Sequence, residues 1–420
     1  MRQEESARPA LVSRNLQGRL EEALADTRVV LIGGPRQAGK STLSSHTLRA
    51  RAGTQVFSLD NQTVREAAVA DPLGFVGLNA TTMLIDEVQR VPSLGLAIKE
   101  VVDRAGRPGQ FLLTGSASVF TLPQFADALV GRMEILTLYP FSQGELRGVR
   151  EDFIDRMFGT EPDLGHTSSL GKQDYVELAV RGGYPEVVER PAGRRRSSWF
   201  ASYLRTLIQR DLTSLAQLDR LADVPNLLRL AAARSASPLN MDSLARDAGI
   251  AGNTARHWLA LLQNLFLLAM LPAWSNNRTS RAALAPKLFM VDSGLAAYLV
   301  GVNAASFSQP TMESGWLLET MVVMDLVRQL GWSETECSAH HFRTRDGDEV
   351  DCVLEAIDRR VVGLEVKSSA TVTAADFRGL RLLARAAREN FRAGIVLYTG
   401  ARSLSFGDGM FAMPISALWA

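Results

Sequence analysis

The chain has 420 residues, of which 46% are hydrophobic and 22% are charged. These values are typical of folded globular proteins rather than disordered or fibrous ones, and the length predicts two or three domains. The 46 basic and 45 acidic residues leave a formal net charge of +1, so the overall charge argues neither for nor against a nucleic-acid partner.

The first 150 residues alternate between short apolar strands and amphipathic helical stretches. We predict strands at residues 28–32, 55–59, 82–85, 111–113 and 134–138. Strands that alternate with helices in this way predict a parallel sheet in an α/β domain. Because the pattern ends near residue 145, we assign residues 1–150 to this domain.

A glycine-rich loop, 33-GGPRQAGKST-42, follows the first predicted strand and opens a helix. It matches the pattern of a P-loop, in which backbone N–H groups and a helix N-terminus bind phosphate. Lys40 is expected to reach the β- and γ-phosphates, and the Ser41 hydroxyl to ligate magnesium. A glycine-rich strand-to-helix turn is the plain alternative. The predicted ATP-binding residues are Gly34, Pro35, Arg36, Gln37, Ala38, Gly39, Lys40, Ser41 and Thr42.

Two acids end the third predicted strand, in 82-TMLIDEVQR-90. Asp86 is predicted to bind ATP–magnesium and to act, with Ser41, as a metal ligand. Glu87 is predicted to polarise the attacking water. Because binding alone needs only the first acid, the second acid indicates hydrolysis.

Two further segments contribute candidates to the same site. The strand in 111-FLLTGSAS-118 ends in Thr114 and Ser116, and a hydroxyl there is expected to sense the γ-phosphate. Arg132, in 129-LVGRMEIL-136, is a candidate catalytic arginine, acting in its own subunit or in a neighbouring one. A surface arginine with a structural partner is the alternative.

Residues 151–275 are predicted to form a helical, winged-helix-like domain. The segment 241-MDSLARDAGIAGNTARHWLALL-262 indicates helix, turn and helix, with Gly249 in the turn, and residues 265–274 are a candidate wing. Such a unit either packs on the nucleotide domain or contacts DNA. DNA contact would use polar side chains near the start of the second helix, namely Asn253, Thr254, Arg256 and His257.

Three carboxylates and a lysine mark residues 276–420. Glu319 lies in a helix predicted at 314–330, Asp351 ends a predicted hairpin, and Glu365 and Lys367 share one face of the strand 361–367. Carboxylates suit Mg²⁺, which can generate hydroxide for attack at phosphorus. We therefore predict catalytic roles for Glu319, Asp351, Glu365 and Lys367, with Asp351 and Glu365 as metal ligands. Ordinary ion pairs at a strand rim are the alternative.

A basic helix is predicted beside this group, at about residues 374–391. Its arginines recur at steps of three and four residues and would form one stripe. A basic stripe suits a nucleic-acid backbone, although it is equally a solvated helix face. The stripe consists of Arg378, Arg381, Arg385, Arg388 and Arg392.

The segments GGPRQAGKSTL, LIDEVQR, LLTGSAS, LVGRMEILTLYPFSQGE and GGYPEVV resemble those of prokaryotic AAA+-type ATPases of the archaeal-ATPase-like branch. The resemblance covers nearly the whole chain. It implies ATP and Mg²⁺ as ligands, with homo-oligomerisation as an option, and a C-terminal domain of unknown function. Residues 276–420 resemble the PD-(D/E)XK nuclease fold, although Val350 stands in place of the proline. A second Mg²⁺ or Mn²⁺ would follow from that fold.

From these patterns we predict a cytoplasmic, Mg²⁺-dependent ATPase that binds nucleic acid, DNA in preference to RNA, with cleavage as an option. The alternative is a nucleotide-dependent switch or scaffold that binds a protein partner through an inactive nuclease-like domain. Two cysteines are too few for a disulfide framework, and the polar N-terminus lacks the apolar core of a secretory signal. No apolar stretch is long enough to predict a membrane span.

Overall fold

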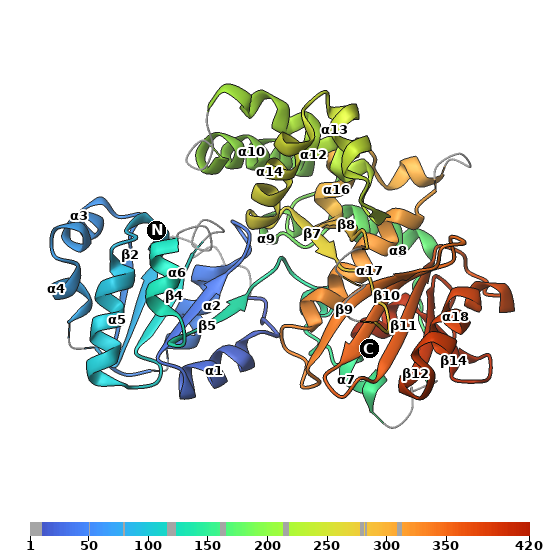
Figure 1. Ribbon diagram of the computed structural model, residues 1–420, viewed down its shortest axis with the longest axis horizontal. Coiled ribbons are helices and arrows are strands. Elements are labelled where there is room, and N and C mark those ends of the chain that lie inside the picture. The colour runs from blue at the N-terminus through green and yellow to red at the C-terminus, as the bar shows by residue number, and fades with distance from the viewer. Residues whose placement is uncertain are drawn as a thin grey trace, which may run out of the picture.

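The structure of the chain is a computed structural model that describes residues 11–49, 51–78, 80–115, 123–159, 165–212, 218–277, 281, 284–308 and 313–420. Figure 1 shows three regions: an N-terminal sheet flanked by helices, a helical region, and a C-terminal sheet. The N-terminal sheet stands apart from the other two regions in this view, and the chain crosses to them after β5.

The N-terminal region is a five-stranded parallel sheet in the order β2-β3-β4-β1-β5. The parallel α/β prediction is therefore confirmed. The strands are β1 (Val29–Gly33), β2 (Thr54–Ser58), β3 (Thr82–Asp86), β4 (Phe111–Thr114) and β5 (Met133–Thr137). The accompanying helices are α1 (Gln17–Asp26), α2 (Lys40–Leu48), α3 (Gln62–Ala70), α4 (Pro72–Val76), α5 (Leu94–Ala105) and α6 (Pro123–Leu129). This order places the carboxyl ends of β1, β4 and β3 side by side, which is where ligands bind to such sheets.

The helical region contains the predicted helix-turn-helix pair, α13 (Met241–Ala248) and α14 (Gly252–Asn264). Gly249 ends α13 in the left-handed conformation (φ 71°), which glycine adopts without a steric penalty. The other helices are α7 (Phe153–Phe158), α8 (Lys172–Arg181), α9 (Pro185–Val188), α10 (Arg194–Leu207), α12 (Val224–Ala233) and α16 (Ser293–Val300).

A small antiparallel sheet crosses the boundary that we predicted at residues 275/276. Its order is β6-β8-β7, with β6 (Ser237–Pro238), β7 (Leu268–Leu271) and β8 (Lys287–Met290). The stretch 265–274 supplies only one strand, β7, of an antiparallel pair, and its partner β8 comes from residues after the predicted boundary. The helical region thus keeps a strand from residues that we had assigned to the C-terminal domain.

The C-terminal region is a six-stranded mixed sheet in the order β13-β14-β12-β11-β10-β9. Its strands are β9 (Cys337–Arg343), β10 (Glu349–Ala356), β11 (Val361–Lys367), β12 (Phe391–Tyr398), β13 (Leu404–Ser405) and β14 (Met410–Pro414). Helix α17 (Gly315–Gln329) packs in one hydrophobic cluster with Leu354 and Leu364, while α18 (Arg378–Ala387) packs in another with Val353 and Val396. The two helices therefore cover opposite faces of the sheet.

The basic helix is shorter than predicted. It ends at Ala387 because Arg388 adopts a left-handed φ of 55°, and β12 begins at Phe391. Arg388 and Arg392 thus lie beyond the helix, and Arg378 forms an ion pair with Asp348. A continuous five-arginine stripe on one helix is not formed.

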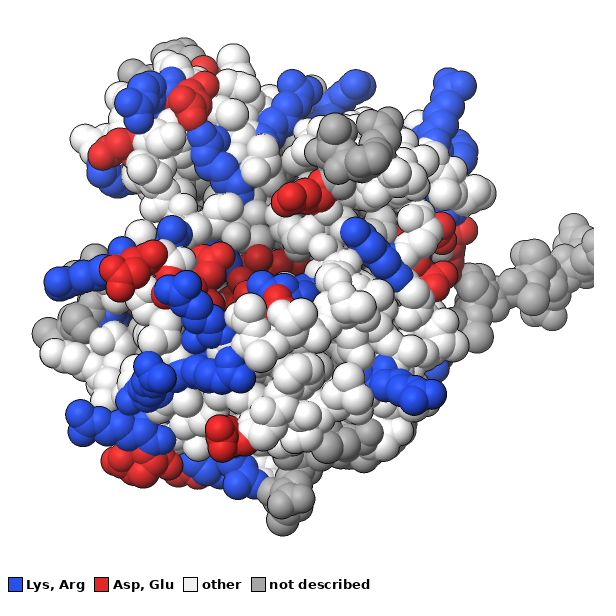
Figure 2. Space-filling model, turned by 90° about the vertical axis from the view of Figure 1, so that its right-hand side faces the viewer, with Lys and Arg blue, Asp and Glu red and all other residues white. Residues whose placement is uncertain are grey.

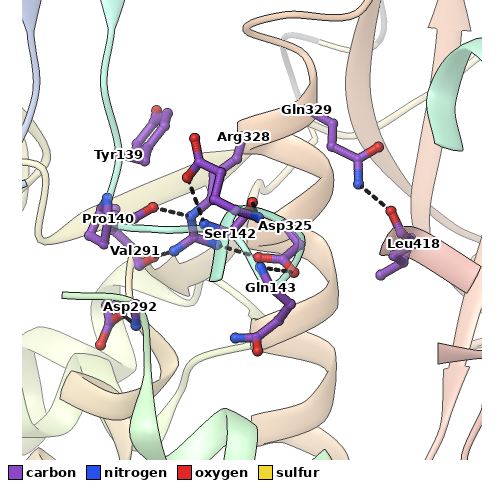
Figure 3. A network of polar contacts seen from close by, with 12 residues as sticks. Tyr139, Pro140, Ser142, Gln143, Val291, Asp292, Asp325, Arg328, Gln329 and Leu418 are labelled. Carbon is purple, nitrogen blue, oxygen red and sulfur yellow. Dashed lines mark hydrogen bonds and ion pairs between the residues drawn. The ribbon is translucent and has the colours of Figure 1, made fainter. Parts of the chain in front are cut away.

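Arg328 of α17 joins the three regions (Figure 3). It is 5% exposed, and its guanidinium donates to Pro140 O (2.9 Å), Val291 O (3.1 Å) and Asp325 Oδ1 (3.0 Å). Pro140 follows β5 of the N-terminal sheet, while Val291 follows β8 of the small sheet. One buried guanidinium therefore satisfies backbone carbonyls from both neighbouring regions.

Glu151 gives this junction a pH dependence. Burial, together with the nearby Asp325 charge, raises the pKa of Glu151 from the ordinary 4.5 to about 8. A raised carboxyl pKa means that the folded state binds the proton more tightly, so stability falls as pH rises from about 4.5 through about 8. We expect Glu151→Gln to lose less unfolding free energy than wild type across this range. Urea unfolding at pH 5 and pH 8 measures the difference. Glu66→Gln, an exposed change, is the control. If the free energy of unfolding of wild type and Glu151→Gln changed equally between pH 5 and pH 8, the assignment would be contradicted.

Within the described residues, no helix combines the length and the apolar character that crossing a bilayer requires.

Candidate nucleotide site and C-terminal acidic cluster

The P-loop connects β1 to α2 and wraps around the Lys40 side chain. Lys40 is 7% exposed, and its ammonium donates to the carbonyl oxygens of Gly34 (2.9 Å) and Pro35 (2.8 Å). Gly34 has a φ of 141°, and a Cβ at this position would lie 2.1 Å from Leu138 O. Only glycine fits there, because backbone from the end of β5 passes directly against the loop.

The ends of three strands and α2 bring the predicted magnesium ligands together. Ser41 Oγ donates to Asp86 Oδ1 at 2.8 Å, and Thr114 Oγ1 donates to the same carboxylate oxygen. Hydroxyl and carboxylate oxygens are the donors that Mg²⁺ prefers, so the side chains of Ser41 and Asp86 fit this ion. Thr114 lies between them because β4 lies between β1 and β3.

Glu87 follows Asp86 in a strained conformation. Its φ of 57° is left-handed, a region that non-glycine residues rarely occupy and that often marks functional sites. The Glu87 N–H donates to Thr114 Oγ1 (3.3 Å), and its carboxylate lies 3.9 Å from Arg36 Nη1. The sequence did not predict that this P-loop arginine pairs with the catalytic candidate.

Arg132 lies at the amino-terminal ends of the strands, opposite the end where the P-loop lies. It directly precedes β5, and its carbonyl accepts from the Val29 N–H at the start of β1. The P-loop follows the other end of β1, a strand length of roughly 15 Å away. The Arg132 guanidinium instead binds both carboxylate oxygens of Asp103, at 2.6 and 2.8 Å. This position does not fit a role at the ATP site of its own subunit. A role toward a neighbouring subunit stays a prediction, and Ser116 lies outside the described residues.

Arg14 supports the P-loop from a distant part of the sequence. Its guanidinium donates to Ala38 O (2.8 Å) and Tyr139 O (2.6 Å), and it forms an ion pair with Glu145 (2.9 Å). The guanidinium also lies 4.6 Å from the centroid of the Phe141 ring. Sequence reasoning missed this residue because no local motif links positions so far apart.

A cavity of about 300 Å³ opens beside the start of α2. Its walls come from the N-terminal segment, from α2, and from the chain around α9. They include Val12, Arg14, Thr42, Leu43, His46, Phe141 and Pro185. The cavity is partly apolar and adjoins Gly39 of the P-loop.

The predicted C-terminal carboxylates also come together, but around a lysine that we did not predict. Lys287 of β8 is 1% exposed, and its ammonium lies 2.5 Å from Glu319 Oε1 and 2.9 Å from Asp351 Oδ1. The second oxygen of Asp351 accepts from the Val366 N–H at 2.9 Å. Glu319 comes from α17 and Asp351 from β10, so the lysine bridges elements that the sequence keeps separate.

Glu365 and Lys367 form the ion pair expected of neighbours on one strand face, at 2.7 Å. Glu365 Oε2 is buried and makes no hydrogen bond within the described structure. Burial and the Asp351 charge raise the pKa of Glu365 to about 8. Burial and the same charge also raise the pKa of Glu319. The cluster thus sets three carboxyl groups against two lysines, and burial favours the protonated form of Glu319 and Glu365.

These residues do not form a cage for a divalent ion. Among the described residues, no group of three or more His, Cys, Asp and Glu side chains is placed to hold a metal. Two of the three predicted carboxylates already bind the Lys287 ammonium. The metal that we predicted at Asp351 and Glu365 therefore does not fit the side chains as they lie.

Comparisons with known protein families match three separate stretches of the chain. Residues 26–147 match the AAA domain, residues 172–306 match a domain of unknown function (DUF8612), and residues 314–418 match another (DUF4143). The first match agrees with the parallel sheet and the P-loop geometry, so residues 26–147 are similar to an AAA domain.

Two uncharacterized proteins, from Mycobacterium tuberculosis and Mycobacterium bovis, are each 28% identical to the chain over 410 residues. Each match covers 96% of this chain and 83% of the relative. Among solved structures, a Walker-type ATPase of Pyrococcus abyssi is 16% identical, with a TM-score of 0.43 over 69% of this chain and 96% of its own. A RuvB variant of Thermotoga maritima is 17% identical, with a TM-score of 0.28 over 61% and 89%.

Proposed function

We propose that the chain hydrolyses ATP at the site between β1, β3 and β4. The observation that carries this proposal is the convergence of Lys40, Ser41, Asp86 and Glu87 at one sheet edge. A P-loop alone supports binding. The second acid beside it supports hydrolysis, because it can orient a water molecule for attack on the γ-phosphate.

Each side chain has a distinct part in this proposal. Lys40 exchanges its two carbonyl acceptors for phosphate oxygens, which offer a full negative charge. Ser41 and Asp86 would hold Mg²⁺, which neutralises charge on the phosphates when bound. Glu87 accepts a proton from the attacking water. Arg36, paired with Glu87 in this structure, is placed to release the carboxylate once phosphate binds the loop.

The base of ATP is proposed to occupy the cavity beside α2. That cavity adjoins Gly39 and Thr42, which are themselves residues of the phosphate-binding loop. His46 and Leu43 supply a flat and an apolar wall from one helix face, since residues three apart on a helix are neighbours.

Phosphate release from ATP tests this proposal. Wild type is expected to turn over ATP in the presence of Mg²⁺, and Lys40→Ala to lose both turnover and tight ATP binding. Lys172→Ala removes an exposed lysine at the start of α8 and serves as the matched control. Equal turnover by Lys40→Ala and wild type would overturn the proposal.

Nucleic-acid binding by α13 and α14 is a second candidate function. Asn253, Arg256 and His257 are exposed near the start of α14, and Arg246 is exposed on α13. In helix-turn-helix proteins this part of the second helix enters the major groove. Figure 2 shows basic side chains protruding from one face of the molecule around a hollow with an acidic floor. Because an acidic floor repels phosphate, we assign nucleic-acid contact to α14 rather than to that hollow.

Replacing Arg256 with alanine tests this second function. We expect duplex DNA affinity to fall, and the dependence of log K on log salt to lose a slope of about 1, because one phosphate contact is removed. Fluorescence anisotropy at several salt concentrations measures both quantities. Arg104→Ala, an exposed change on α5, is the control. Absence of salt-dependent binding by wild type to DNA or RNA would exclude this function and favour a protein partner.

A further inference from the structure

We infer that the ammonium of Lys287 takes the place of a divalent cation in the C-terminal acidic cluster, so that this nuclease-like site is filled by the chain itself and does not cleave nucleic acid. This inference goes beyond ATP hydrolysis, because it concerns a separate site in the C-terminal sheet.

The position of Lys287 carries the argument. Its Nζ lies between Glu319 Oε1 and Asp351 Oδ1, at 2.5 and 2.9 Å, where a cation bridging the two carboxylates would lie. Mg²⁺ binds oxygen at roughly 2.0–2.1 Å and requires near-octahedral surroundings. The ammonium and a metal ion cannot both occupy this space.

Burial makes the lysine difficult to displace. The side chain is 1% exposed, and taking an ammonium out of water costs several kcal/mol unless carboxylates compensate it. Removing Lys287 from the cluster would leave the Glu319 and Asp351 carboxylates together without a cation. A metal ion would therefore have to replace both the charge and the volume of the lysine.

The groups around Lys287 come from several elements. Glu319 belongs to α17 and Asp351 to β10, while His341 Nε2 of β9 donates to Ala285 O (3.0 Å), two residues before Lys287. The lysine itself belongs to β8, which pairs with β6 and β7 of the helical region. Lys287 and its two carboxylate partners thus form a junction between the DUF8612 region and the DUF4143 region.

Manganese binding tests the inference on the full-length, nucleotide-free protein. Mn²⁺ titrations followed by electron paramagnetic resonance are expected to give the same number of bound ions for wild type and Asp351→Asn. A bound ion in wild type that disappears in Asp351→Asn would overturn the inference. So would Mg²⁺- or Mn²⁺-dependent cleavage of DNA or RNA by wild type that Asp351→Asn abolishes.

Removing the lysine provides the converse test. Lys287→Ala is expected to gain one bound Mn²⁺ per chain and a higher melting temperature with Mn²⁺, and both gains should vanish in Lys287→Ala/Asp351→Asn. Lys287→Met, which preserves more of the packing, replaces the alanine variant if that variant does not fold. The control is Arg281→Ala, which removes the cation paired with Glu355; Glu355 lies on β10, the strand that also carries Asp351. A folded Lys287 variant that gains no bound Mn²⁺, or an equal gain in Arg281→Ala, would contradict the inference.

Discussion

Glu87→Gln is expected to reduce the rate of ATP turnover by a factor of about 10²–10⁴ while ATP binding is retained. The amide preserves the size of the side chain but cannot accept the proton of the attacking water. Lys40, Ser41 and Asp86 remain in place to bind ATP and magnesium. Steady-state phosphate release gives the rate, and equilibrium binding of a fluorescent ATP analogue gives the affinity.

The matched control for this change is Glu100→Gln, an exposed substitution on α5 that also exchanges a carboxylate for an amide. It is expected to leave turnover within about twofold of wild type. Unchanged turnover in Glu87→Gln would refute the role of Glu87. Loss of ATP binding in that variant would show that the carboxylate supports the loop instead, through its pair with Arg36.

Arg328→Met is expected to lower the free energy of unfolding by about 3–5 kcal/mol, because it removes the cation from a buried pair. Asp325 would stay buried without its partner, and the carbonyls of Pro140 and Val291 would each lose a donor. Methionine keeps much of the side-chain length and packing, so the loss of unfolding free energy measures the contribution of the guanidinium contacts. Urea unfolding monitored by tryptophan fluorescence measures it.

Arg385→Met, an exposed change on α18, is the control and is expected to alter stability by less than about 0.5 kcal/mol. Equal stability of Arg328→Met and wild type would mean that the junction does not depend on this guanidinium. A separate early transition for the N-terminal sheet in Arg328→Met would be further support, since Pro140 connects that sheet to the rest of the chain.

The arrangement of the candidate nucleotide site could largely be predicted because its parts lie on one loop and one parallel sheet. The spacing from Gly34 to Ser41 forces one loop between a strand and a helix, and Asp86 ends a strand of the same parallel sheet. The parallel arrangement then brings those strand ends to one edge. Arg132 shows the limit of this reasoning, because its role depends on which end of β5 it occupies.

The C-terminal site was predictable only in part. Helix α17 and strands β10 and β11 appear where their periodicity indicated, and they bring Glu319 near Asp351. Lys287 left no signal in the sequence, because it begins a short buried strand 64 residues before Asp351 and belongs to another sheet. A buried charge pair is fixed by tertiary packing, so neither composition nor spacing reveals which cation the carboxylates receive.

The most direct test of the ATPase account is a structure of Glu87→Gln with ATP and Mg²⁺. We predict that the Lys40 ammonium leaves Gly34 O and Pro35 O and contacts the phosphates, with Ser41 and Asp86 around the metal and the base in the cavity beside α2. Nucleotide bound elsewhere, with Lys40 still on those two carbonyls, would contradict the account.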